Sequence, residues 1–284
     1  MESERSNWKP TNLWEALGLD AGGVIAVVGA GGKSALLHRA AREARERGAA
    51  LLLSVTTRLA TAQEQIADRT ARIGAGVGGS SGADSTAPFL APAPGEVVLF
   101  AGAKLPKIGK TEGISPEELC VLSKRHARTP LLVEADGAGG ADLKVPGPGE
   151  PVIPECARLV VAVTAFPALG AGCRSARVHR REALERVAAG GDRIDPKLFG
   201  RLLGHRQGCF KGSPPGAGRV WLINQADTPE TMERAHAFAE EARSPDHCPL
   251  PPDLIVAGSL RSGTLAGMGI FGYSARVESE HGSL

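Results

Sequence analysis

Aromatic residues are scarce in this chain: they make up 4% of its 284 residues, and only one of them is a tyrosine. Binding surfaces for single-stranded nucleic acid depend on aromatic side chains that stack on bases. An excess of one charge is also missing, since 33 Lys and Arg residues stand against 31 Asp and Glu residues, a net charge of +2. We therefore expect neither nucleic acid nor an acidic membrane surface as a partner.

Long apolar stretches are missing as well. No run reaches the roughly 18 apolar residues of a membrane-spanning helix. The N-terminal segment MESERSNWKPTNLWEALGL contains acidic residues and lacks the apolar centre of a signal peptide. These absences predict a cytoplasmic protein without membrane contacts.

Cysteine is infrequent and scattered, and no C-x-x-C pair occurs. An odd number of widely spaced cysteines favours reduced thiols over a disulfide framework or a structural zinc site. We expect reduced, mostly structural thiols at all five positions, which are Cys120, Cys156, Cys173, Cys209 and Cys248.

Short continuous apolar runs alternate with helical patterns along the chain. Continuous runs are typical of parallel strands that are covered on both faces. The expected strands are Val24–Val28, Ala50–Val55, Glu96–Phe100, Leu131–Val133, Leu159–Val163, Val220–Ile223 and Leu254–Val256. The expected helices are Lys33–Arg47, Pro116–Arg128, Arg181–Ala189, Asp195–Gly204 and Pro229–Ala242.

This alternation predicts an α/β protein with three layers, in which a mostly parallel sheet has helices on both faces. We expect a single domain over residues 1–284. Residues 69–95 are rich in Gly, Ser and Pro and predict a flexible loop. Residues 165–218 hold two short helical patterns and predict a small helical insertion.

The segment VIAVVGAGGKS, Val24–Ser34, combines a buried strand, a glycine-rich turn and the start of a helix. Backbone N–H groups in such a turn and at a helix N-terminus can approach phosphate oxygens closely. Lys33 adds a positive charge, and Ser34 stands where phosphate-binding loops ligate Mg²⁺. We expect a phosphate-binding loop, whose candidate residues are Gly29, Ala30, Gly31, Gly32, Lys33 and Ser34.

Two other interpretations of this loop remain open. The full motif G-x-x-x-x-G-K-[ST] would require glycine at position 27, where this chain has Val27. The spacing of Gly29, Gly31 and Ser34 also fits part of a dinucleotide-binding pattern. However, Leu51–Arg58 contains no acidic residue to bind a ribose. The third interpretation is a purely structural turn.

The run LLVEADGAGG places two carboxylates at the end of an apolar strand. Because residues two apart on a strand point to the same face, Glu134 and Asp136 can both reach a cation at the carboxyl edge of the sheet. Asp136 and Gly139 have the D-x-x-G spacing of proteins that bind a metal-bound terminal phosphate. We expect Ser34, Glu134 and Asp136 as metal ligands, and Lys33, Glu134 and Asp136 as catalytic residues.

Another polar cluster, NQAD, follows the run at Val220–Ile223. Asn224 and Asp227 have the N-x-x-D spacing by which GTPases hold guanine, although Gln225 replaces the usual lysine. The alternative is a turn that caps the following helix through Asp227 or Thr228. Ser259, after the last predicted strand, is a further candidate for contact with the base.

Two further groups are candidates at the nucleotide. Thr56 and Thr57 end the second predicted strand and can approach the metal, with Arg58 near the terminal phosphate. Their alternative explanation is β-propensity followed by a turn. His179 and Arg180 belong to a basic cluster at a helix start, and such clusters are usually solvated.

Six motifs follow one another along the chain: GAGGKS, SVTTR, VEADGAGG, LKVPGPGEPVIP, VHRRE and LINQAD. Taken in this order, they resemble the YqeC family of selenium-dependent hydroxylase accessory proteins. The resemblance covers about residues 10–260 and implies a P-loop NTPase-like fold and a role in the maturation of selenium-dependent molybdenum hydroxylases. The family's Glu-Pro-Val-Ile-Pro segment stands at 150–154 and its His-Arg pair at His179 and Arg180.

The residues and the resemblance together predict an Mg²⁺-dependent protein that binds GTP or ATP and hydrolyses it. A molybdenum hydroxylase or a selenium-delivery protein is the implied partner. One alternative is a non-catalytic module that binds a cofactor or selenium carrier and uses the nucleotide as a switch. Another is an ATP-dependent ligase, because Mur-type ligases share a short G-x-x-G-K-[ST] loop.

Overall fold

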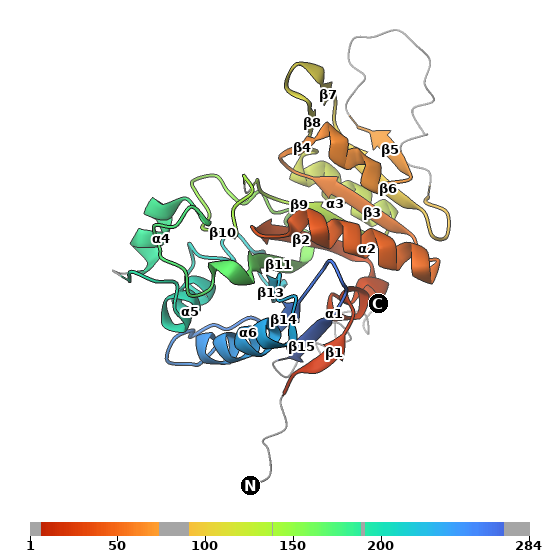
Figure 1. Cartoon of the computed structure of the whole chain (residues 1–284). Coiled ribbons are helices and arrows are strands. Elements are labelled where there is room, and N and C mark those ends of the chain that lie inside the picture. The colour runs from red at the N-terminus through yellow and green to blue at the C-terminus, as the bar shows by residue number, and fades with distance from the viewer. Residues whose placement is uncertain (1–6, 74–90, 138, 189–190, 270–284) are drawn as a thin grey trace.

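A large sheet forms the centre of the molecule. The computed structural model describes residues 7–73, 91–137, 139–188 and 191–269. Within these residues, ten strands form one sheet in the order β1-β15-β14-β13-β11-β2-β9-β3-β6-β5 (Figure 1). The strands are β1 (Lys9–Thr11), β2 (Gly23–Gly29), β3 (Leu51–Val55), β5 (Arg69–Arg72), β6 (Val97–Ala101), β9 (Pro130–Glu134), β11 (Ala157–Ala165), β13 (Gly218–Asn224), β14 (Leu254–Gly258) and β15 (Leu265–Gly269).

All neighbouring pairs from β14 to β5 are parallel, and only β15, near one edge, runs in the opposite direction, pairing antiparallel with both β14 and β1. The chain leaves β2 toward β3 on one side and later crosses from β9 to β11 on the other side. The order of strands therefore reverses at β2. Open α/β sheets bind ligands at such a switch point, outside the carboxyl ends of the strands.

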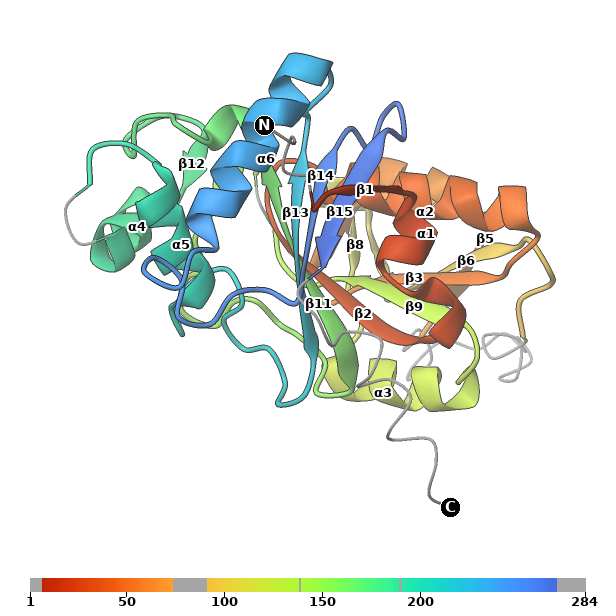
Figure 2. The same cartoon turned by 90° about the horizontal axis from the view of Figure 1, so that it is seen from below.

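Helices cover both faces of the sheet and produce three layers, as the sequence predicts. The side chains of β2 alternate between two buried cores, with Val24 and Val28 in one and Ile25 and Val27 in the other. The first core contains residues of α3, α4, α5 and α6, and the second contains residues of α1 and α2 (Figure 2). The helices are α1 (Leu13–Ala16), α2 (Lys33–Arg47), α3 (Pro116–Arg125), α4 (Arg181–Ala188), α5 (Pro196–Gly204) and α6 (Pro229–Ala242).

Two small sheets stand beside the main one. The first has the order β4-β8-β7, and the second pairs β10 with β12 in parallel. Their strands are β4 (Arg58–Ala60), β7 (Lys104–Leu105), β8 (Lys110–Glu112), β10 (Leu143–Lys144) and β12 (Val178–His179). Short 3₁₀ helices occur at η1 (Leu19–Ala21), η2 (Thr61–Ile66), η4 (Pro106–Ile108) and η5 (Phe166–Ala168).

Each predicted strand and helix lies where the sequence places it, within a few residues at the ends. Residues 165–218 contain α4 and α5, and also β12, which joins this segment to β10. The predicted loop over 69–95 is wrong at its start, where Arg69–Arg72 form β5 and pair with β6. Most of that loop, residues 74–90, lies outside the described residues.

The prediction of reduced thiols is wrong for two cysteines. Cys120 on α3 and Cys156, just before β11, form a disulfide whose Cα atoms are 5.7 Å apart. The two residues are separated by 36 positions, and only the packing of α3 brings them together. The other cysteines, Cys173, Cys209 and Cys248, are free and buried.

Across the described residues, none of the helices combines the length and the apolar character needed to cross a bilayer.

Candidate functional site

A glycine-rich loop connects β2 to α2 at the switch point of the sheet. Its backbone passes so close to neighbouring strands that side chains would not fit. A Cβ atom on Gly29 would lie 2.4 Å from the carbonyl oxygen of Val163, and one on Gly31 would lie 2.4 Å from the backbone nitrogen of Ala165. Both glycines have positive φ angles, of 91° and 78°. The glycines in this loop are therefore required by its path.

Two polar side chains hold the loop in place. Asp136 Oδ2 accepts a hydrogen bond from the Gly29 N–H at 3.1 Å. Asn224 Nδ2 donates to the carbonyl oxygen of Gly31 at 2.9 Å, while its Oδ1 accepts from the Leu260 N–H at 3.1 Å. Residues from the ends of three different strands thus fix one loop conformation.

Lys33 begins α2 and points back into the site. Its side chain is only 4% exposed, and its Nζ lies 3.1 Å from Asp136 Oδ1 and 3.7 Å from Glu134 Oε1. Nζ also donates to the carbonyl oxygen of Gly29 at 2.6 Å. The predicted lysine and the two predicted carboxylates are therefore in direct contact.

Glu134 is the least satisfied of these charged groups. Burial raises the pKa of its carboxyl above the usual range, and Asp136 adds to the increase while Lys33 opposes it. Its Oε2 is buried and has no hydrogen-bond partner among the described residues. A buried oxygen of this kind needs a ligand, a water molecule or an ion to accept from or coordinate.

A chain of alternating charges extends from Asp136 away from the loop. Lys144 on β10 has a fully buried side chain, and its Nζ lies 3.1 Å from Asp136 Oδ2 and 2.8 Å from Glu150 Oε2. Its Nζ also donates to the carbonyl oxygen of Gly137 at 2.5 Å. Glu150 Oε2 lies 3.0 Å from Arg180 Nη2. The loop is thereby connected to the helical insertion through ion pairs.

A cavity of about 540 Å³ opens beside the loop. Its walls come from the start of α2, from β4, η2 and β8, from the end of β9, and from residues 137 and 139–142. The predicted site residues that line it are Gly31, Gly32, Lys33, Ser34, Arg58, Glu134 and Gly139. Gln225, Lys110 and Gln63 line it too, although the sequence does not assign them a site role.

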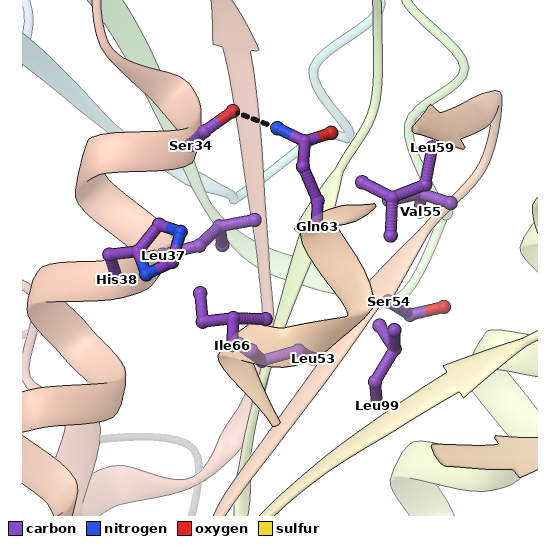
Figure 3. A pocket seen from close by; sticks show the side chains of 10 residues that line it. All are labelled: Ser34, Leu37, His38, Leu53, Ser54, Val55, Leu59, Gln63, Ile66 and Leu99. Carbon is purple, nitrogen blue, oxygen red and sulfur yellow. Dashed lines mark hydrogen bonds between the residues drawn. The ribbon is translucent and has the colours of Figure 1, made fainter. Parts of the chain in front are cut away.

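The Ser34 hydroxyl faces η2. Figure 3 shows the Gln63 side chain pointing toward it, and Gln63 Nε2 donates to Ser34 Oγ at 2.7 Å. Below this bond, Leu37, Leu53 and Ile66 close a small apolar pocket between α2 and β3. Because the Ser34 hydroxyl accepts this one hydrogen bond, it keeps a lone pair for another partner.

Other predicted residues do not line the cavity. The Thr56 N–H donates to the carbonyl oxygen of Glu134 at 3.1 Å, so Thr56 and Thr57 sit next to the carboxylates without lining the cavity. Ser259 is 2% exposed and accepts at its Oγ from the Ser262 N–H at 3.3 Å. Asp227 is exposed and outside the cavity lining.

The helix-capping explanation for this region holds for Thr228. Its side chain accepts from the Thr231 N–H, and the reciprocal bond from the Thr228 N–H completes a capping box at the start of α6. Asn224, in turn, uses both ends of its amide on the backbone of the loop and of Leu260. Contact of Asn224 and Asp227 with guanine stays a prediction.

His179 and Arg180 reach the site from the helical insertion. His179 pairs in register with Lys144, and its Nδ1 lies 4.0 Å from the position a Cβ atom would take on Gly139. Burial and the charges of Lys144 and Arg180 lower the pKa of His179. Arg180 binds Glu150, and although burial opposes the effect, Lys144 and Arg180 hold the pKa of Glu150 below its usual range.

Sequence reasoning missed Lys144 and Glu150 as members of the charge cluster. Both lie in the segment Lys144–Pro154, whose proline and glycine content indicates either a stiff connector or a loop over the site, without a role for these two side chains. The available signal was the presence of two opposite charges within this run, directly after the carboxylates at Glu134 and Asp136. Nothing in the sequence pattern distinguishes Lys110 from other surface lysines.

The fold and the site define a class: a three-layer α/β protein with a glycine-rich loop, a buried lysine and two carboxylates at the switch point of a parallel sheet. Comparison with known proteins narrows this class. The family model described as YqeC protein matches residues 25–182. The chain is also 33% identical over 206 residues to a protein of Escherichia coli strain K12 named "Uncharacterized protein YqeC", and the match covers 71% of this chain and 75% of that relative.

The chain therefore belongs to the YqeC family. The matched residues 25–182 include the loop, both carboxylates and the whole charge chain as far as Arg180. Asn224, Asp227 and Ser259 lie outside that range.

Proposed function

We propose that this protein binds a nucleoside triphosphate with Mg²⁺ at the glycine-rich loop and hydrolyses it. The observation that carries the proposal is the start of α2. Gly32, its N-cap, provides no side-chain hydrogen bond, and the helix opens directly into the cavity. The first N–H groups of a helix have no intrahelical acceptors, so they stabilise an anion placed there.

Lys33 supports this assignment because it is the only lysine on the loop and lines the cavity at the start of α2. Its ammonium contacts Gly29, Glu134 and Asp136. Phosphate oxygens offer the same charge-assisted hydrogen bonds as these carboxylates do. Lys33 can therefore exchange a carboxylate for a phosphate without losing its compensation of charge.

The donor set around the loop fits Mg²⁺. Ser34 supplies a hydroxyl oxygen, while Glu134 and Asp136 supply carboxylate oxygens. Glu134 Oε2 and Asp136 Oδ1 are both buried without a hydrogen-bond partner among the described residues, and Asp136 Oδ1 faces Lys33 Nζ at 3.1 Å. Mg²⁺ prefers such oxygen ligands and keeps several water molecules, so it binds through one or two carboxylates and the substrate phosphates. No group of three or more His, Cys, Asp or Glu side chains that could enclose a metal occurs among the described residues, which favours an ion carried by the nucleotide.

Bound Mg²⁺ would neutralise the charge that develops on the phosphate oxygens. The residues of this chain would then orient the reactants. The loop amides and Lys33 hold the phosphates, and Glu134, with its raised pKa, can orient an attacking water molecule and accept its proton. Positioning and charge compensation account for most phosphoryl-transfer catalysis.

The proposal includes both GTP and ATP. Asn224 is engaged with the backbone of the loop, and Asp227 lies outside the cavity, so the described contacts select neither base. The resemblance to selenium-dependent hydroxylase accessory proteins supports a role in the maturation of selenium-dependent molybdenum hydroxylases, with such a hydroxylase or a selenium-delivery protein as partner.

Calorimetric titration with GTP and ATP, each with and without Mg²⁺, tests the proposal. We expect binding that requires Mg²⁺ and that weakens by about 10- to 100-fold in Lys33→Ala, since a charge-assisted hydrogen bond contributes about 1.5–3 kcal/mol. Lys124→Ala, at an exposed position of α3, is the matched control and should bind like the unaltered protein. Circular dichroism confirms that each variant is folded. Equal affinity of Lys33→Ala and the unaltered protein would exclude the loop as the phosphate site.

A further inference from the structure

The small sheet of β4, β7 and β8 carries two cations that line the cavity, Arg58 and Lys110. In the pairing of β4 with β8, Arg58 lies opposite Glu112 and Ala60 lies opposite Lys110. Because side chains alternate between the two faces of a strand pair, Arg58, Ala60, Lys110 and Glu112 share one face. Arg58, Ala60 and Lys110 line the cavity, whereas Glu112 is outside its lining.

The other face of this sheet is packed against the protein. Leu59 is 5% exposed and Thr111 is fully buried. Thr111 Oγ1 donates to a carboxylate oxygen of Glu64, whose other oxygen accepts from Arg72 at 2.6 Å. These contacts fix which face of the sheet is turned toward the cavity.

The sheet is also anchored to the end of β3, next to the carboxylates. The Ile114 N–H donates to the carbonyl oxygen of Val55 at 2.9 Å. At Gly113, a Cβ atom would lie 2.3 Å from the carbonyl oxygen of Thr57. The backbone that carries the two cations is therefore held close to the site and is not a free surface hairpin.

The charges in the cavity are distributed unevenly. Lys33 faces Glu134 and Asp136, so its charge is compensated within the protein. Within the part of the chain that the structure describes, the side chains of Arg58 and Lys110 form no hydrogen bond or ion pair, and their backbones pair in the β4–β8 ladder. Among the described residues, the cavity-lining cations without an ion pair thus lie on β4 and β8.

We propose that Arg58 and Lys110 form a subsite for a second ligand that carries a phosphate group and binds in the same cavity as the nucleotide. Two positive charges match a phosphate dianion better than a single carboxylate, and the planar guanidinium of Arg58 can bind two phosphate oxygens at once. The proposal depends on the proposed function in one respect, because it takes the neighbouring loop to be filled by the nucleotide. It assigns the protein a second, phosphorylated substrate.

Inorganic phosphate is the probe for this subsite. The protein is first saturated with Mg²⁺ and a non-hydrolysable triphosphate analogue, so that the loop is filled, and phosphate is then titrated by calorimetry. We expect phosphate to bind and its affinity to fall about tenfold in Arg58→Ala and in Lys110→Ala. Lys107→Ala, on the same hairpin but outside the cavity lining, should leave phosphate affinity unchanged. All three positions are exposed, so the variants should fold normally.

Three results would overturn the subsite. The first is that the triphosphate-saturated protein binds no phosphate. The second is a tenfold loss of triphosphate affinity in Arg58→Ala or Lys110→Ala, which would place these cations on the terminal phosphate of the nucleotide. The third is equal binding of acetate, which would show a general anion site.

A further experiment separates failure of the subsite from failure of nucleotide binding at the loop. If the unaltered protein binds no triphosphate, phosphate is titrated into nucleotide-free Lys33→Ala and into the same variant with Arg58→Ala added. Binding that is lost only when Arg58 is replaced supports the subsite without the nucleotide. Binding that does not respond to Arg58 contradicts the subsite.

Discussion

Glu134 and Glu150 belong to one cluster of charges, yet their pKa values move in opposite directions. Glu150 lies between two cations, Lys144 and Arg180, which outweigh the effect of its burial. Glu134 is buried more deeply and lies next to another carboxylate, so burial outweighs the attraction of Lys33. These opposite pKa shifts indicate different roles. Glu150 stabilises the cluster of charges, whereas Glu134 keeps a basic oxygen without a hydrogen-bond partner beside the cavity.

The raised pKa of Glu134 predicts a pH-dependent stability. A carboxyl whose pKa is higher in the folded than in the unfolded protein stabilises the fold below the unfolded pKa of about 4.3, and this contribution is lost as the pH rises through the folded value. Glu134→Gln stays neutral. We therefore expect Glu134→Gln to be more stable, relative to the unaltered protein, at about pH 8 than at about pH 4, as a larger difference in the free energy of unfolding. Urea unfolding with EDTA across this range measures the difference.

Glu96→Gln provides a control of opposite sign. Hydrogen bonds from Arg69 and the Ala93 N–H lower the pKa of Glu96, so its contribution is present at neutral pH and lost as the pH falls. Glu96→Gln should therefore be less stable than the unaltered protein at neutral pH, and this difference should disappear as the pH falls. Parallel stability curves for Glu134→Gln and the unaltered protein would contradict the assignment of Glu134.

At the scale of elements, β10 shows how a strand of two residues can organise a site. Its Lys144 is fully buried, and three oxygens surround the ammonium. Removing one partner of a buried ion pair leaves the other charges without compensation and costs about 3–5 kcal/mol. β10 is therefore held in place mainly by this lysine and by its pairing with β12.

Lys144→Met should lower the free energy of unfolding by about 3–5 kcal/mol, because it leaves Asp136 and Glu150 facing each other without the cation. Urea unfolding measures the loss. Lys124→Met, on the exposed side of α3, should change it by no more than about 0.5 kcal/mol. Glu150→Gln should lower the free energy of unfolding less in the Lys144→Met background than in the unaltered protein, because it then removes a carboxylate that has lost the charge of Lys144. A loss of under about 1 kcal/mol for Lys144→Met would contradict the ion network.

The elements that sequence patterns predict are those whose own residues determine them. β2 and α2 are examples, because a run of Val, Ile and Ala precedes the glycines and a helical pattern follows. β15 reads LAGMG, which has two glycines and no β-branched residue, and it is a strand because β14 and β1 pair with it. β4 and β8 are likewise too short for a pattern and depend on pairing with each other.

The same distinction applies to the site. The loop, Lys33, Glu134 and Asp136 follow continuous patterns and are in contact as expected. The disulfide between Cys120 and Cys156 and the position of Lys110 depend on how distant segments pack, which spacing along the chain does not encode.

At the scale of the whole molecule, the charge chain connects two parts that the fold keeps apart. The loop lies at the centre of the sheet, while α4 and α5 lie beyond it on the side away from β5 and β6 (Figure 1). A chain of ion pairs links the loop to α4 and α5 and consists of Lys33, Asp136, Lys144, Glu150 and Arg180. If Lys33 binds a phosphate, as proposed, Asp136 would lose part of its charge compensation and attract Lys144 more strongly.

This link predicts that a ligand at the loop changes the dynamics of the helical insertion. On addition of Mg²⁺ and a non-hydrolysable triphosphate, we expect slower amide hydrogen exchange at residues 29–36, at 143–150 and at 178–184, with little change in β1 and β15. Glu150→Gln interrupts the ion chain before Arg180. In this variant the protection should still increase at 29–36, because the loop is intact, but not at 178–184. Equal protection of 178–184 in Glu150→Gln and the unaltered protein would show that the effect reaches the insertion by another route, since Glu150 is the carboxylate through which Lys144 and Arg180 are joined.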